Sequence, residues 1–268
     1  MPISGIWKRL ATAVVFIPVF VWVVEGPSGL FHALIVALSA GACWELVRML
    51  ERAERVTHSR LAVAAAAIVT ASFLYVPRGP TVALVVTLLV VLSASLFTPT
   101  ERSVESAATT VLAVTYVSWL LGHAVLLREL PGGARLILFL VGVTWCGEAA
   151  AYAVGSTLGR WKLAPIISPG KTIEGAVAQL AVSVGAAPLL GLWLLPDWSS
   201  ARLLGAGLLL GVLGQLGDLA ESAIKRSLGT KDTGGLIPGH GGVLDRLDGL
   251  LFNAPALFYY VTNVGGGS

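Results

Sequence analysis

The sequence contains little charge for its length and very little cysteine. Only 12% of its 268 residues are Asp, Glu, Lys or Arg, which is about half the proportion found in soluble proteins. The two cysteines, Cys43 and Cys146, lie far apart in apolar stretches, so we interpret them as small core residues rather than as a disulfide or a metal pair. This composition excludes a soluble fold, a disulfide-stapled secreted domain and a nucleic-acid-binding protein.

Long uncharged stretches take the place of the missing charge. Hydrophobic residues make up 56% of the chain and the mean hydropathy is +0.82. A membrane-spanning helix needs about 20 predominantly apolar residues. We therefore predict an all-α polytopic integral membrane protein with about nine transmembrane helices, the first of them a retained span rather than a signal peptide. The stretches are 10–24, 26–44, 61–77, 79–100, 106–127, 136–159 (interrupted only by Glu148), 175–196, 203–217 and 249–268.

The basic residues predict how these helices are oriented. If the N-terminus is cytoplasmic and the helices alternate, 14 of the 18 Lys and Arg residues fall in cytoplasmic loops and 4 fall outside. Cytoplasmic loops of membrane proteins carry such an excess, so we predict an N-in, C-out topology. We divide the chain into N-terminal membrane helices of about five spans (1–135), a C-terminal catalytic membrane region with cytoplasmic loops (136–264) and an artificial linker (265–268).

Two of the predicted cytoplasmic loops, 156–175 and 215–249, hold most of the polar residues that bind polyphosphate and divalent metals. Asp218 follows 15 uncharged residues, and an ionisable group at a membrane boundary indicates function. Helical spacing places Ser222 and Lys225 on the same face as Asp218, so a simple ion pair between Asp218 and Lys225 is the alternative interpretation.

Asp245 and Asp248 are the other carboxylates at this boundary, and they share a face if the last helix begins there. Three such carboxylates suggest a site for Mg²⁺, which is usually held by one or two carboxylates together with substrate phosphates. Neither Cys nor His has zinc-ligand spacing. Glu148 interrupts the sixth stretch and is a further candidate, whose partner is a metal, a basic side chain or substrate.

A glycine-rich segment lies between these acidic residues. Gly239, Gly241 and Gly242 permit backbone N–H groups to approach a phosphate closely, and His240 is either a structural or a phosphate-binding residue. Basic residues flank the segment, which favours phosphate over a plain turn: Lys225, Arg226, Lys231 and Arg246.

The segment from Ser168 to Thr172 resembles the end of a Walker loop. It lacks the first glycine of that pattern and no strand is expected before it, so a P-loop nucleotidase is rejected. The segment remains a candidate second anion-binding loop through Ser168, Lys171 and Thr172.

Taken together, these motifs resemble the signature of the phosphatidate cytidylyltransferase family (CDP-diacylglycerol synthases). The resemblance is carried by Ser222, Lys225–Arg226, Lys231–Asp232 and Pro238–Asp248, and it extends to Gly217–Glu221 and to the 151–175 block. It covers roughly residues 140–262. The sequence departs from the family pattern at Glu148, where Asp is common, and at Gly170, where Lys is common.

The resemblance implies transfer of a cytidylyl group from CTP to phosphatidate in phospholipid biosynthesis, with Mg²⁺ and a monovalent K⁺ beside it. It implies a homodimer in a bacterial-type inner membrane, with the catalytic loops facing the cytoplasm. The expected catalytic residues are Lys225, Arg226, Asp245, Arg246 and Asp248. The expected substrate-binding residues are Ser168, Lys171, Thr172, Ser222, Lys231, Gly239, His240, Gly241 and Gly242. The expected metal-binding residues are Asp218, Asp245, Asp248 and Glu148.

Two other functions remain open. A related CTP-dependent enzyme, such as a CDP-archaeol-type synthase or a lipid kinase, would act on a different membrane lipid, because nothing in the sequence identifies the lipid chain. A membrane transporter would also have many spans and an intramembrane Asp, but its charges would follow a path at the membrane midplane rather than collect at one face.

Overall fold

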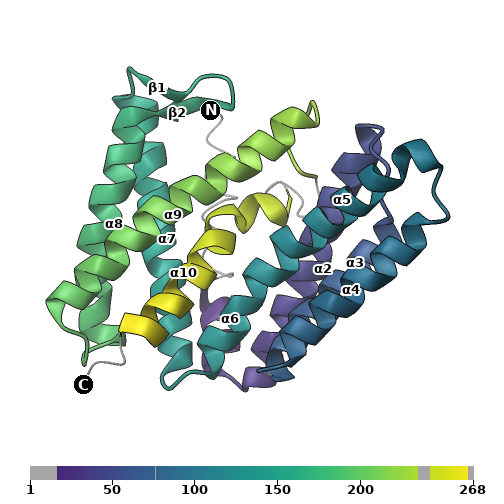
Figure 1. The fold of residues 1–268 in the computed structure, drawn as a ribbon. Helices are drawn as coiled ribbons and strands as arrows, with labels where there is room; N and C mark the ends of the chain where they lie inside the picture. The colour runs from purple at the N-terminus through teal and green to yellow at the C-terminus, as the bar shows by residue number, and fades with distance from the viewer. Residues whose placement is uncertain (1–16, 76, 235–241, 265–268) are drawn as a thin grey trace.

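The computed structural model describes residues 17–75, 77–234 and 242–264, and nearly all regular structure in these ranges is helical (Figure 1). The prediction of an all-α chain is thus confirmed in its main part. The helices are α2 (Ser28–Arg52), α3 (Ser59–Ser72), α4 (Gly79–Ser95), α5 (Ser103–Val114), α6 (Leu120–Glu129), α7 (Gly133–Thr157), α8 (Ile173–Leu194), α9 (Ser200–Ser227) and α10 (Asp248–Val264). Shorter helical turns are η1 (Phe73–Tyr75), η2 (Thr100–Arg102), the π-helical η3 (Thr115–Trp119) and η4 (Leu244–Arg246), and residues 17–25 are helical before α2.

The chain departs from the all-α prediction between α7 and α8. Here β1 (Lys162–Ala164) and β2 (Ser168–Thr172) pair antiparallel in a small hairpin. Pro165 and Pro169 disfavour a helix in this segment, so its backbone groups pair across the hairpin instead. The side chain of Thr172 then caps α8 by accepting a hydrogen bond from Gly175 N at 3.2 Å.

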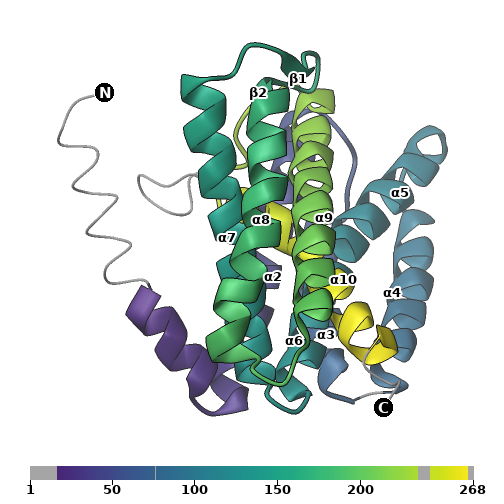
Figure 2. The ribbon, with the colours of Figure 1, turned by 90° about the vertical axis from the view of Figure 1, so that its left-hand side faces the viewer.

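The helices pack in two groups with α10 between them (Figures 1 and 2). Helices α7, α8 and α9 lie side by side, and α10 contacts α9 on one side and α6 on the other. Helices α8 and α9 approach closely at Gly207, where a Cβ atom would lie 2.6 Å from Ser183 O and 2.8 Å from Ala187 Cβ. A glycine is therefore required at this crossing, as in other closely packed membrane helices.

The two polar loops meet at one end of the molecule. Figures 1 and 2 show the β1–β2 hairpin at the same end as the C-terminal end of α9, whereas the α8–α9 connection and the C-terminal end of α10 lie at the opposite end. Antiparallel packing of α8 against α9 produces this arrangement, since Thr172 precedes the first residue of α8 and Ser227 is the last residue of α9.

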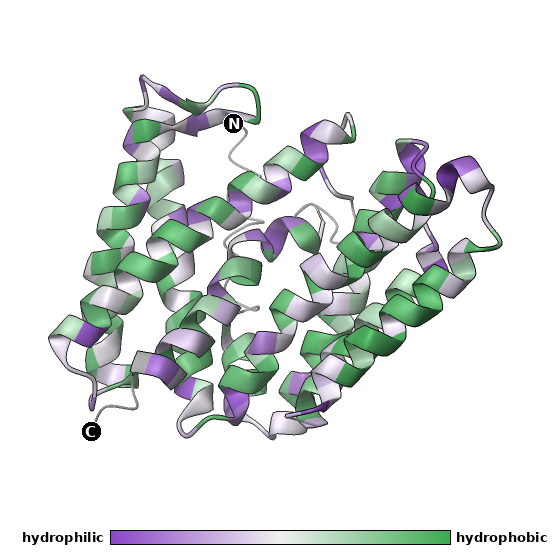
Figure 3. Cartoon of the chain, in the orientation of Figure 1, coloured by the Kyte–Doolittle hydropathy of each residue, from purple (hydrophilic) through white to green (hydrophobic). Residues whose placement is uncertain are grey.

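The outer surface is apolar, as expected for a protein in contact with lipid. Large hydrophobic side chains on α4 and α8 are more than half exposed, among them Leu89 and Trp193, and Figure 3 shows apolar residues along the outward faces of the helices. Within the described ranges, five helical segments are long and apolar enough to cross a membrane: 28–52, 100–129, 133–157, 173–194 and 200–227. This chain is a membrane protein, and the higher count of nine spans stays a prediction.

The two cysteines differ in their surroundings. Cys43 is fully buried in α2, as predicted for a small core residue, whereas Cys146 in α7 is exposed. The interpretation of Cys146 as a core residue was wrong because an apolar stretch of a membrane helix has an outward face as well as an inward one.

Candidate active site

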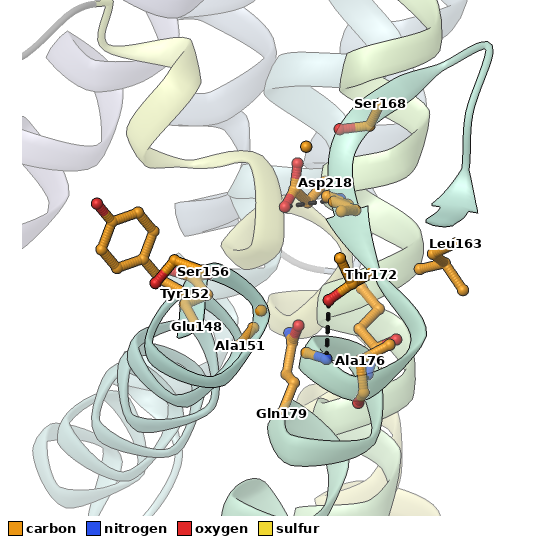
Figure 4. Close-up of a pocket in the computed structure, with 15 residues that line it drawn as sticks. Glu148, Ala151, Tyr152, Ser156, Leu163, Ser168, Thr172, Ala176, Gln179 and Asp218 are labelled. Carbon is orange, nitrogen blue, oxygen red and sulfur yellow. Dashed lines mark hydrogen bonds and ion pairs between the residues drawn. The ribbon is translucent and has the colours of Figure 1, made fainter. Parts of the chain in front are cut away.

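A cavity of about 390 Å³ lies between α7, the hairpin, α8 and α9 (Figure 4). Glu148 comes from α7, Lys171 from β2 and Asp218 from α9, so residues 70 positions apart in the sequence line one space. Five residues predicted from the sequence are brought together here: Glu148, Ser168, Lys171, Thr172 and Asp218. Thr172 is buried, and its hydroxyl group caps α8.

Asp218 forms its ion pair with the hairpin rather than with its own helix. Lys171 Nζ lies 2.7 Å from Asp218 Oδ2, and Ser222 Oγ lies 3.5 Å from Asp218 Oδ1. The alternative pairing of Asp218 with Lys225 is therefore wrong. Helical spacing alone could not reveal this, because β2 folds back over α9 and supplies the nearer amine.

Lys225 instead links two other carboxylates. Its Nζ atom lies 2.9 Å from Glu221 Oε1 and 2.8 Å from Asp245 Oδ1. Its side chain is 13% exposed and that of Glu221 is fully buried. Lys225 thus connects α9 to η4 across a protected ion-pair network.

Asp245 is held by the segment that precedes it. Its Oδ2 atom accepts hydrogen bonds from Thr233 Oγ1 at 2.8 Å and from Gly242 N at 3.0 Å. Burial by itself raises the pKa of Asp245, but the hydrogen bonds from Lys225, Gly242 and Thr233 outweigh burial and hold the pKa below its usual value. Asp245 is therefore ionised at neutral pH.

Asp248 begins α10, and its Oδ1 atom accepts a hydrogen bond from Gly249 N at 2.7 Å. Asp245 lies in the separate turn η4, so the two residues do not share one face of an α-helix. Gly249 packs directly against Glu148, since a Cβ atom there would lie 2.6 Å from Glu148 Oε1. This contact joins the start of α10 to the cavity.

Acidic groups outnumber basic groups around this end of α9. Five carboxylates and three basic groups interact electrostatically here: Glu148, Asp218, Glu221, Asp245 and Asp248 against Lys171, Lys225 and Arg246. Glu221 Oε2 is buried and has no hydrogen-bond partner among the described residues. No group of three His, Cys, Asp or Glu side chains in the described ranges surrounds a single metal position.

The remaining predicted residues lie around this centre. Arg226 Nε donates to Ile167 O at 3.2 Å and so ties the end of α9 to the hairpin. Arg246 is exposed and lies within electrostatic range of Glu148, and Lys231 is exposed. The N–H group of Gly242 already donates to Asp245. Three predicted residues lie outside the described residues: Gly239, His240 and Gly241.

Three residues near the site were not predicted. Glu45 of α2 and Thr233 hydrogen-bond with the segment that carries Asp245. Tyr116, in the π-helical turn η3, has a buried hydroxyl group without a partner among the described residues, within electrostatic range of Glu221, Asp248 and Asp218. The one sequence signal for Glu45 is its place directly after the uncharged stretch 26–44, the kind of position that drew attention to Asp218.

Comparisons with known proteins identify the family to which the sequence is similar. The sequence model described as the cytidylyltransferase family matches residues 7–264. The chain is 38% identical over 169 residues to a phosphatidate cytidylyltransferase of Staphylococcus aureus (strain COL), which is 63% of this chain and 64% of that protein. It is 42% identical over 136 residues to a phosphatidate cytidylyltransferase of Synechocystis sp., covering 50% of this chain and 45% of that protein.

The chain is also 44% identical over 152 residues to the uncharacterized protein YnbB of Escherichia coli (strain K12), covering 57% of this chain and 50% of that protein. The matches thus span less than two thirds of the length of each of these relatives.

Proposed function

This chain belongs to the cytidylyltransferase family, and we propose that it transfers a cytidylyl group from CTP to phosphatidate, giving CDP-diacylglycerol and pyrophosphate. The relatives named phosphatidate cytidylyltransferase support this choice of substrates. The observation that carries the proposal is the meeting of two polar segments at one end of α9, through the ion pairs Lys171–Asp218 and Lys225–Asp245.

The reaction requires positioning and charge neutralisation more than an activated nucleophile. A phosphate oxygen of phosphatidate attacks the α-phosphorus of CTP, the bond from that phosphorus to the bridging oxygen breaks, and pyrophosphate leaves with the electron pair. Lys171 and Lys225 stabilise the negative charge of the phosphates, and Arg226 and Arg246 add positive charge at the mouth of the site. Ser168 and Ser222 supply hydroxyl groups that hydrogen-bond to phosphate oxygens.

The excess of carboxylates fits a divalent cation. We propose that Asp218 and Asp245 hold Mg²⁺, with Asp248 and Glu148 as further oxygen donors and a K⁺ ion beside them. Because no three such side chains surround one position in the described ranges, waters and substrate phosphates, which Mg²⁺ readily takes as ligands, would have to complete its coordination. When bound, Mg²⁺ would stabilise the charge that develops on the leaving pyrophosphate.

We further propose that the site faces the cytoplasm of a bacterial-type inner membrane, where CTP is available. The excess of Lys and Arg in these loops motivates this orientation, because the predicted N-in, C-out topology with about nine spans would assign both polar loops to the cytoplasmic face. The family resemblance leads us to propose that the chain functions as a homodimer.

The test uses the purified protein with phosphatidate in mixed micelles and CTP labelled at either the α- or the γ-phosphate. We expect Mg²⁺-dependent transfer of the α-label to lipid with release of pyrophosphate. Asp218→Asn and Asp245→Asn should lower turnover about 100- to 1,000-fold, while Asp197→Asn, an exposed Asp in the α8–α9 connection, should retain wild-type turnover.

Several results would contradict the proposal. Transfer of the γ-label identifies a lipid kinase, and α-label transfer only to an ether lipid identifies a CDP-archaeol-type synthase. Solute uptake into liposomes without CTP turnover identifies a transporter. Full Mg²⁺-dependent turnover by Asp218→Asn removes that residue from the metal site.

A further inference from the structure

Glu45 is a buried carboxylate in an apolar helix. It lies on α2, seven residues before the end of the helix at Arg52, and is 1% exposed. Burial of a carboxylate is unfavourable unless hydrogen bonds or a counter-charge compensate for it. The groups that surround Glu45 therefore indicate why the residue is there.

The compensating hydrogen bond comes from the residue next to Asp245, while Glu45 Oε1 is buried without a hydrogen-bond partner among the described residues. Glu45 Oε2 accepts a hydrogen bond from Leu244 N at 2.9 Å, and Thr233 Oγ1 lies 3.4 Å from the same oxygen. Thr233 Oγ1 also lies 2.8 Å from Asp245 Oδ2. The hydroxyl group of Thr233 thus stands between the two carboxylates, and Leu244 is the residue next to Asp245.

The backbone at Gly234 and at Gly242 packs closely against the Glu45 side chain. A Cβ atom at Gly234 would lie 3.0 Å from Glu45 Oε1, and a Cβ atom at Gly242 would lie 2.6 Å from Glu45 Oε2. Gly234 follows Thr233, and Gly242 donates its N–H group to Asp245. One carboxylate therefore contacts both ends of the stretch from 233 to 244.

We propose that Glu45 is a positioning residue that holds residues 233–234 and 242–244 in place and so orients Asp245 for the reaction. This inference rests on the proposed function, because Asp245 is the group being oriented. In this proposal the N-terminal helices contribute directly to the site, because Glu45 of α2 holds in position both Thr233, which hydrogen-bonds to Asp245, and Leu244, which precedes Asp245. Partners that orient a metal-binding carboxylate typically change metal affinity or activity about 10- to 100-fold when they are removed.

The test compares Glu45→Gln with Glu51→Gln, which removes the same charge from an exposed position on the same helix. We expect Glu45→Gln to raise the Mg²⁺ concentration for half-maximal turnover, or to lower kcat, about 10- to 100-fold. The KM for phosphatidate should change less than about 2-fold, because uniform substrate binding is not affected. Glu51→Gln should behave as wild type.

A second measurement needs neither substrate nor Mg²⁺. Hydrogen–deuterium exchange should be faster in Glu45→Gln than in Glu51→Gln for the peptide that contains Gly242 and Leu244, because the anchor of these amides is weakened. If Glu45→Gln does not accumulate, Glu45→Asp, which withdraws the carboxylate by one methylene group, should give the same pattern.

Wild-type Mg²⁺ dependence and wild-type exchange in Glu45→Gln would overturn the inference, even if its thermal midpoint fell. Failure of the proposed function has a different signature, since the unmodified protein would then transfer no cytidylyl group to any phosphate lipid. Even if the proposed function failed, faster hydrogen–deuterium exchange in Glu45→Gln would show that Glu45 holds residues 242–244 in place.

Discussion

Lys225 neutralises two carboxylates that would otherwise face each other in a protected environment. Glu221 is fully buried and Asp245 is 17% exposed, and both lie within 3 Å of the Lys225 ammonium group. Removal of one partner from a buried ion pair leaves an uncompensated charge, which costs about 3–5 kcal/mol. The lysine is therefore required for folding stability as well as for its proposed role in binding phosphate.

The corresponding prediction concerns Lys225→Met. We expect the free energy of unfolding to fall by about 3 kcal/mol or more, measured by denaturant titration in mixed micelles. Addition of Glu221→Gln should restore part of the loss, because one of the two opposing charges disappears. Lys162→Met, at an exposed lysine in β1, should change stability by less than about 0.5 kcal/mol. Equal stability of Lys225→Met and Lys162→Met would contradict the ion-pair network.

At the scale of elements, the crossing of α9 and α10 determines where Asp248 lies. A Cβ atom at Gly217 would lie 2.5 Å from Asp248 O and 3.2 Å from the ring of Phe252. The clash is with backbone, so a larger residue must move the start of α10 away from α9. Such a shift also moves Asp248 relative to Asp218, which lies next to Gly217 in α9.

We therefore predict opposite effects for two Gly→Ala substitutions. Gly217→Ala should lower stability by about 1–3 kcal/mol through overpacking and should lower cytidylyl transfer with it. Gly185→Ala, where nothing lies within 4 Å of the new Cβ atom, should be neutral or stabilising by up to about 1 kcal/mol, because alanine favours the helix. Thermal unfolding and turnover of the two variants in the same detergent provide the comparison, and wild-type turnover of Gly217→Ala would refute the argument.

The elements could be predicted from the sequence to different degrees. The apolar stretches predicted the helices well, since a span must satisfy its backbone hydrogen bonds internally. The hairpin at 162–172 was missed because its few residues have no strand periodicity. The pairing of Lys171 with Asp218 was missed because it depends on that hairpin. The position of Glu45 after an uncharged stretch was a signal, but its role was missed because its partners, Thr233 and Leu244, lie 188 and 199 residues away, and a single sequence carries no trace of such a contact.

At the scale of the whole molecule, the two ends of the helix bundle differ in their chemistry. The hairpin end holds the ion pairs of the candidate site, and the opposite end holds the short α8–α9 connection with Asp197. If both polar loops are cytoplasmic, Gly170 in the hairpin and Asp197 lie on opposite sides of the membrane.

Thiol labelling tests this orientation. In a background of Cys43→Ala and Cys146→Ala, an impermeant maleimide should label Asp197→Cys in intact cells. Gly170→Cys should be labelled only after permeabilisation. Gly170 is a suitable position, since nothing lies within 4 Å of a Cβ atom there. The reverse pattern would invert the topology and remove the proposed access of the site to cytoplasmic CTP.

The contact between Glu45 and Leu244 also has a consequence for the biogenesis of the protein. Bacterial ribosomes add about 5–20 residues per second, so α2 is complete roughly 10–40 s before Leu244 is synthesised, given their separation of 199 residues. During that interval the carboxylate of Glu45 lacks the amide that later satisfies it, and burial of a carboxylate without such a partner is costly. The contact between α2 and the turn η4 therefore forms late relative to α2 itself, and the site is assembled only after Leu244 has been added.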